Sequence, residues 1–209
     1  HENSSTTRTD VHNELGVKVD INQRKIELAI VKFGGMSAGG TEKFLQNIAA
    51  HIDKSRFNVT FFYCDSAPYY GSDYVHEDSD SSRIAWLENE GVTLRKFSVA
   101  AKDVRRRDHP WINTDFWDHF REEDFDILQT ARAGHPEFPF TQIRKIPIID
   151  SIHLNAGVHN QKNIARVMHL SNWSQTQWVR RGGDKSKSLI VSHPIPDFVE
   201  KQFSPRKHA

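Results

Sequence analysis

The sequence has almost no cysteine and no long apolar run. Its 209 residues include a single cysteine, Cys64, so no disulfide can form within the chain. No stretch reaches the roughly 18 apolar residues that a membrane-spanning helix requires, and no secretory signal is recognisable. Together these absences favour a reducing, cytoplasmic setting.

Net charge is also nearly absent. The 28 lysines and arginines balance 27 aspartates and glutamates, which leaves a formal charge of +1. The chain therefore lacks the basic surplus that is typical of nucleic-acid-binding proteins, and we expect no nucleic-acid partner. Its length suits one well-buried domain.

From residue 25 onward, short β-branched runs alternate with amphipathic helical segments. The predicted strands are 25–33, 57–64, 92–97, 125–130, 146–150, 165–170 and 188–192. The predicted helices are 41–54, 81–90, 114–123 and 174–181. Such alternation is typical of right-handed βαβ crossovers. It predicts an α/β fold, a Rossmann-like, doubly wound and mainly parallel sheet of about seven strands with helices on both faces.

The domain boundaries follow from the same pattern. Residues 1–24 are polar and without a sustained period, so we interpret them as a flexible leader. Residues 25–198 form the predicted domain, and residues 199–209 are a tail or the start of an interdomain linker.

A glycine-rich corner follows the first predicted strand, in the segment VKFGGMSAGGTEKFLQNIA (31–49). In a doubly wound sheet the first strand-to-helix turn is the usual place for a phosphate, because glycines allow close approach and the helix N-terminus carries partial positive charge. Thr41 suits an N-cap or first-turn position. The spacing is neither the dinucleotide fingerprint nor a P-loop, so a tight turn without a ligand is the alternative.

Four segments carry a family resemblance, in the right order along residues 25–198. They are GGTEKFLQNIAAHIDKSRFNVTFFYCD, FDILQTARAGHPEFPF, IPIIDSIH and HLSNWSQTQWVRRGGDKSKSLIVSHPIPDF. These segments resemble the amino-terminal domain of family-four glycosyltransferases.

The resemblance implies half of a GT-B enzyme, in which two Rossmann-like domains face each other across a cleft. The amino-terminal domain holds the acceptor, and a carboxyl-terminal domain, in cis or as a partner subunit, holds the nucleotide-sugar donor. The implied activity is retaining transfer of a sugar to an acceptor hydroxyl, with no metal or other cofactor. This chain by itself is expected to be inactive, and peripheral membrane contact through a membrane-borne acceptor is an option.

The resemblance also suggests roles for individual residues. Gly39 and Gly40 match the family's glycine loop, which approaches the donor diphosphate. Glu42 is expected to orient that loop, and His153 to position the reactants. The residues that the resemblance places near the acceptor are Arg132, Gly134, His135 and Asn172.

Several alternatives stay open. From the residues alone, His153 suits a strand-end histidine bonded to a carbonyl, Arg132 a surface arginine, and Asn172 or Ser174 a helix cap. The pair Asp78 and Asp80 has the spacing of a metal-binding D-x-D motif, although a solvated acidic loop is the simpler interpretation.

Other functions fit parts of the pattern. A stand-alone Rossmann-like domain that binds a nucleotide or phosphate without catalysis is the main alternative to the transferase. A flavodoxin-like module is disfavoured because the first strand lacks an acidic pair. The basic run 105–107 suggests an anion-binding patch, with a solvated loop as the alternative.

Overall fold

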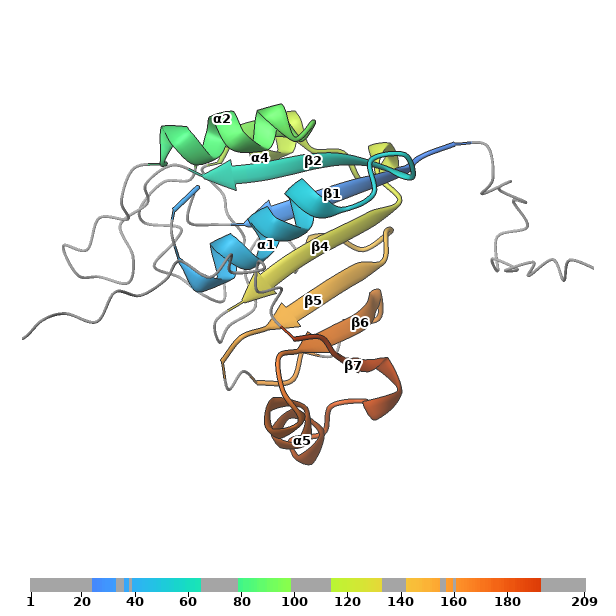
Figure 1. Cartoon of the computed structure of the whole chain (residues 1–209). Helices are drawn as coiled ribbons and strands as arrows, with labels where there is room; N and C mark the ends of the chain where they lie inside the picture. Colours follow the sequence, from blue (N-terminus) through green and yellow to red (C-terminus); the bar gives the residue numbers. More distant parts are fainter. Residues whose placement is uncertain are drawn as a thin grey trace, which may run out of the picture.

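The computed structural model describes residues 24–32, 36–37, 39–64, 79–98, 114–132, 142–154, 157–159 and 161–192. Seven strands run through these residues: β1 (Ile26–Lys32), β2 (Phe57–Cys64), β3 (Thr93–Phe97), β4 (Ile127–Arg132), β5 (Ile148–Ile152), β6 (Ile164–His169) and β7 (Ser188–Ile190). The helices are α1 (Gly40–His51), α2 (Ser81–Asn89), α4 (Phe116–His119) and α5 (Asn172–Arg180), with short 3-10 turns at Glu122–Asp124 and Lys185–Lys187 (Figure 1).

The strands form one parallel sheet in the order β3-β2-β1-β4-β5-β6-β7. This order extends the Rossmann arrangement, with β1 and β4 side by side at the centre. The predicted fold class is therefore confirmed. Each predicted strand overlaps an observed one because continuous runs of β-branched and aromatic residues suit strands that are covered on both faces.

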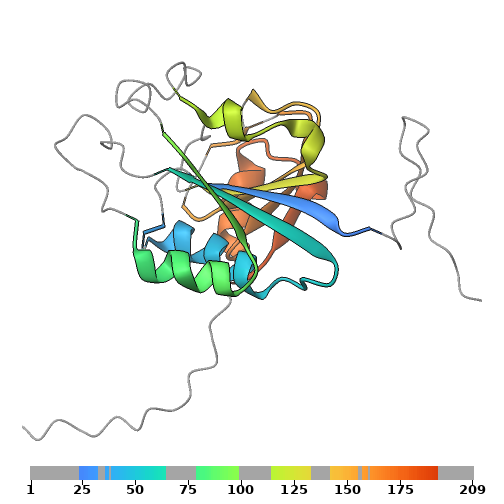
Figure 2. The ribbon, with the colours of Figure 1, turned by 90° about the horizontal axis from the view of Figure 1, so that it is seen from above.

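Helices cover both faces of the sheet. Helices α1 and α2 lie on one face and α4 on the other (Figure 2). On β1, Leu28 and Ile30 pack in the cluster beneath α1, whereas Ala29 and Val31 belong to the cluster on the opposite face. The second cluster also holds Trp178 of α5. We call these the α1 face and the α5 face.

The helix boundaries differ from the predictions in informative ways. Helix α1 ends at His51 rather than Lys54, and the Lys54 ammonium instead donates to the carbonyls of Ala49 and Ala50 at 2.6 and 2.8 Å. The helix predicted at 114–123 is divided, because α4 ends after one turn and a 3-10 turn follows. Phe116 and Phe120 are buried.

The helix caps can be compared with the sequence interpretation. Thr41 is a first-turn residue of α1, one of the two positions predicted for it, and Gly39 occupies the N-cap. Ser171 caps α5 by accepting from the Ser174 amide at 3.2 Å, so neither Asn172 nor Ser174 is the cap. Helix α5 ends at a glycine stop, since Gly182 has a φ of 95°. No helix in the described segments is long and apolar enough to cross a membrane.

Candidate functional site

The glycine corner lies where the sheet changes winding direction. The connection that leaves β1 passes through α1 on one face, and the connection that enters β4 passes through α4 on the other. In open α/β sheets, ligands bind in the crevice that such a divergence opens at the carboxyl ends of the strands. Gly39 and Gly40 stand beside this crevice, at the start of α1.

Gly39 is held tightly by the first turn of α1. Its carbonyl accepts from the Lys43 amide at 2.9 Å, which begins the helix. A Cβ on Gly39 would lie 2.1 Å from Oε2 of Glu42, so no larger residue fits unless that carboxylate moves. Among the described residues, a Cβ on Gly40 would meet nothing within 4 Å. The described part of the chain therefore leaves the space beside the second glycine open.

Glu42 connects the glycine corner to the end of β1. Its Oε1 lies 3.5 Å from Nζ of Lys32, and its Oε2 accepts from the Thr41 hydroxyl at 2.8 Å. Both side chains of the ion pair are buried, so the pair is little screened by solvent. The loop-orienting role of Glu42 stays a prediction, and these contacts show that its carboxylate is held by Lys32 and Thr41. Sequence reasoning missed Lys32, although a lysine that closes the apolar run IELAIVK was a usable signal.

His153 reaches the same corner from β5. It follows Ile152 directly, and its amide donates to the Arg132 carbonyl at 3.1 Å. Its ring packs edge-on against Phe44 of α1, with centroids 4.7 Å apart. Because Phe44 lies one helical turn beyond Gly40, His153 packs on the α1 face against the helix that begins at the glycine corner.

The segment before Gly39 is tied to α1 and α2. The Met36 amide donates to the Ser79 hydroxyl at 3.2 Å, and the Gln46 amide group donates to the Ser37 carbonyl at 3.1 Å. Gln46 in turn accepts from Arg83 of α2 at 2.8 Å. These bonds fix part of the corner to two helices, which favours a preorganised site over a loose turn.

Arg132 lies on the opposite face from His153 and is not a surface residue. Its side chain is 1% exposed, and Nε donates to Oδ2 of Asp150 at 2.7 Å. The surface arginine that the sequence suggested as the alternative is therefore wrong. An acceptor role for Arg132 stays a prediction, and in this structure its guanidinium is engaged by Asp150 and by the Gly157 carbonyl. Burial raises the pKa of Asp150, while the charge of Arg132 opposes that rise.

His169 is a buried neutral histidine on the α5 face. Burial and, to a lesser extent, the charge of Arg132 lower its pKa to about 4. Its Nδ1 lies 3.2 Å from the Ser174 hydroxyl, and its ring is 5.2 Å from the Trp178 ring. Asn172 is exposed at the start of α5, so its acceptor role stays a prediction.

Several predicted positions lie outside the described residues. They are Gly34, Gly35, Asp78, Gly134, His135 and the basic run 105–107. Asp80 is described, and its carboxylate caps α2 by accepting from the Ser82 amide and hydroxyl. Within the described segments, no group of three or more His, Cys, Asp or Glu side chains is arranged to hold a metal.

Comparison with known proteins gives a fold relationship. No protein-family model matches the sequence, and no curated protein does. The structure is similar to that of Anabaena Alr3699/HepE in complex with UDP and glucose, with a TM-score of 0.50 and 11% identity over 81% of this chain and 45% of that chain. HepE structures with UDP and with UDP-glucose each give 0.48 at 12% identity, over 81% of this chain and 44% of that one. The chain thus spans less than half the length of HepE.

Proposed function

We propose that this chain is the acceptor-side domain of a retaining, nucleotide-sugar-dependent glycosyltransferase of GT-B architecture. In this proposal a second, donor-binding domain, in cis or as a partner subunit, closes over the glycine corner. The observation that carries the proposal is the packing of His153, which follows the carboxyl end of β5, against Phe44, one helical turn beyond Gly40. The fold shared with a protein crystallised with UDP and glucose supports it.

The corner is suited to a diphosphate. The first backbone N–H groups of α1 have no partner within the helix and carry partial positive charge, so they can stabilise the departing phosphate. Gly40 leaves the space beside them open, because no atom of the described residues lies within 4 Å of where its Cβ would be. Glu42 holds the loop through Thr41 and Lys32.

The reaction proposed for the assembled enzyme forms one carbon–oxygen bond at the anomeric carbon and breaks another. A hydroxyl of the acceptor attacks the anomeric carbon on the face from which the nucleoside diphosphate leaves, and its proton passes to the departing phosphate oxygen. His153 would orient a sugar or acceptor hydroxyl through its imidazole. No divalent metal is required at the centre, since the backbone N–H groups supply the electrostatic stabilisation.

Calorimetry with UDP, UDP-glucose and GDP tests the proposal on two proteins, the 209-residue chain and the complete product of its natural reading frame. If only the complete protein turns over the donor, the result supports our interpretation of this chain as an acceptor-side domain. Tight nucleotide binding by the 209-residue chain, with no turnover by either protein, would favour a stand-alone binding module.

Two matched glycine variants test the corner within the complete product. Gly40→Ala adds a methyl that meets no atom of the described residues, so it should weaken donor binding by about tenfold while thermal stability stays unchanged or rises slightly. Gly157→Ala, also in open space and away from the corner, is the control. Normal donor affinity in Gly40→Ala would contradict the diphosphate role, and normal turnover in His153→Ala would contradict the role of that histidine.

A further inference from the structure

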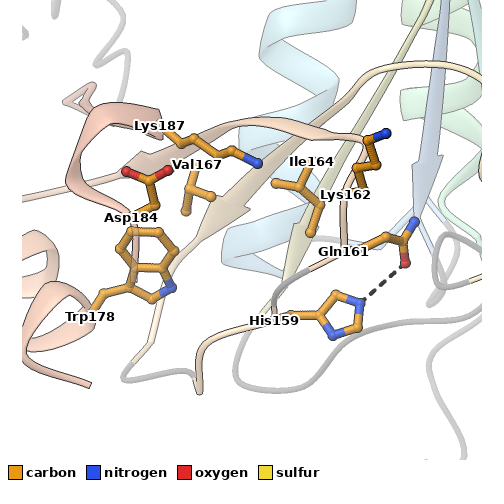
Figure 3. Close-up of a pocket in the computed structure, with 8 residues that line it drawn as sticks. All are labelled: His159, Gln161, Lys162, Ile164, Val167, Trp178, Asp184 and Lys187. Carbon is orange, nitrogen blue, oxygen red and sulfur yellow. Dashed lines mark hydrogen bonds between the residues drawn. The ribbon is translucent and has the colours of Figure 1, made fainter. Parts of the chain in front are cut away.

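A cavity lies at the amino ends of the last two strands, away from the glycine corner. It has a volume of about 150 Å³ and is formed by β6, α5 and the segments that precede β6 and β7. Ile164 is the first residue of β6, and Lys187 immediately precedes β7. The cavity therefore belongs to the amino ends of these strands, whereas Gly39 and Gly40 follow the carboxyl end of β1. We call it the indole cavity because Trp178 forms one wall (Figure 3).

Trp178 presents an unused donor to this cavity. The residue is 4% exposed, and its indole Nε1 has no hydrogen-bond partner in the described part of the chain. In Figure 3 the ring nitrogen lies on the edge that faces the other lining side chains. A buried indole N–H normally finds an acceptor, because leaving it unpaired costs about 1–3 kcal/mol. The wall thus offers a binding contact that the protein does not satisfy with its own described groups.

The indole is held firmly in this orientation. A Cβ on Gly183 would lie 2.2 Å from the Trp178 ring, so the backbone after α5 packs directly against its face. The His169 ring lies 5.2 Å away, at a tilt of 56°. A donor fixed in this way is preorganised for a ligand, since little side-chain freedom is lost when the ligand binds.

The charge at the cavity favours an anion. Lys162 and Lys187 line it, and neither ammonium forms an ion pair within the described segments. Asp184 also lines the cavity, and one of its oxygens accepts from the Ser186 amide and hydroxyl. Two lysines against one carboxylate leave a net positive site.

The remaining walls are apolar on one side and polar on the other. Ile164 and Val167 of β6 face the cavity together with the indole, and the polar side is formed by His159 and Gln161, whose Nε2 and Oε1 lie 3.2 Å apart. A cavity of about 150 Å³ accommodates a molecule the size of benzene. Size, apolar walls and positive charge together suit a compact, partly planar molecule that carries one acidic group.

We propose that the indole cavity binds a small planar organic anion, whose oxygen accepts from the Trp178 indole N–H and whose charge is balanced by Lys162 and Lys187. The acidic group is a carboxylate or a phosphate, and its hydrocarbon part packs on Ile164 and Val167. Such a site is independent of the glycine corner and of the proposed transferase reaction, so either can fail without the other.

Nitrogen-15 NMR of the 209-residue chain tests the proposal, with the indole resonance of Trp178 assigned by its loss in Trp178→Phe. Benzoate and phenyl phosphate are the two anionic probes, and benzyl alcohol is the uncharged one. We expect the Trp178 indole resonance to move with at least one anion, at a Kd near or below about 1 mM, and to respond much less to the alcohol. The tighter anion identifies the acidic group.

Lysine variants then test the charge. Lys162→Met/Lys187→Met keeps the apolar stems and should weaken anion binding by about tenfold or more. Lys185→Met, in the same 3-10 turn but outside the cavity wall, should bind as the unmodified chain does. The proposal is overturned if neither anion moves the resonance up to about 10 mM, if benzyl alcohol binds equally well, or if the double variant binds normally.

Discussion

At the scale of single residues, a buried ion pair joins β4 to β5. Asp150 is fully buried, and its Oδ1 has no hydrogen-bond partner in the described part of the chain. Arg132 supplies the contact to Oδ2 and balances the charge. Breaking such a pair by removing one partner is far more costly than replacing both, because a lone charge is left in the interior.

Arg132→Met should therefore destabilise the fold by about 3–5 kcal/mol near neutral pH, as measured by urea unfolding. Without Arg132 the pKa of Asp150 rises further above its ordinary value of 3.8. The folded variant then keeps a proton that the unfolded chain releases, so its stability is lost as pH rises through the raised pKa. Arg132→Met/Asp150→Asn should recover most of the loss, and an equal loss in acid and at neutral pH would contradict this account.

The neutral His169 predicts a pH dependence of the opposite sign. Its pKa is about 4 in the folded chain and 6.5 in the unfolded reference. Between these values the unfolded chain binds the extra proton, so stability falls as pH drops from 6.5 toward 4. Each pKa unit is worth about 1.4 kcal/mol, so the loss can reach roughly 3 kcal/mol.

Urea unfolding at several pH values measures this slope. His169→Asn removes the titrating group, and it should flatten the dependence between the two pKa values. His51→Gln, at the exposed end of α1, is the matched control and should leave the slope unchanged. A slope that survives in His169→Asn would assign the effect to other groups.

The sequence was least informative about which side chains pair with each other. Arg132 and Asp150 are 18 positions apart, and their pairing depends on the register that places Arg132 beside Ile152 and Thr130 beside Asp150. No local pattern encodes that register. A charge inside each of the apolar runs ILQTAR and IIDSI was the available signal, because buried charges require partners.

At the scale of elements, strands were predictable and caps were not. β2 was predicted with its observed bounds, because the run FNVTFFYC is rich in β-branched and aromatic residues. The cap of α5 depends on which of several neighbouring polar residues turns toward the free amides, and Ser171 rather than Asn172 does so. The position of the first turn of α1 could be predicted from the sequence. The contact between Glu42 and Lys32 could not, because it depends on how α1 packs on β1.

The two glycines that follow α5 allow a prediction about the stability of this helix end. Gly182 has a φ of 95°, and alanine there should cost about 1 kcal/mol. Gly183→Ala should cost more, because its methyl would lie 2.2 Å from the Trp178 ring and force the helix end or the ring to move. Thermal unfolding measures both, and Gly157→Ala is the control with open space around it. A Gly183→Ala variant as stable as the control would contradict this packing.

At the scale of the whole molecule, one sheet carries two cores. Alternate residues of the same strand enter different clusters, as Leu28 and Ala29 do on β1. The two cores therefore pack on opposite faces of the same hydrogen-bonded strands. The overall α/β class followed from the alternation of strands and helices, whereas the meeting of His153 with Phe44 across the α1 face required the assembled sheet.

Sharing one sheet implies that the two cores unfold together. Leu45→Ala in the α1-face core should cost about 2–5 kcal/mol, and hydrogen exchange should show the same loss for the slowest amides of β1 and of β6. Ile148→Ala in the α5-face core should affect both strands in the same way. Glu88→Ala, at an exposed position of α2, is the control. If Leu45→Ala lowered protection only beneath α1, the two halves of the sheet would be separate cooperative units.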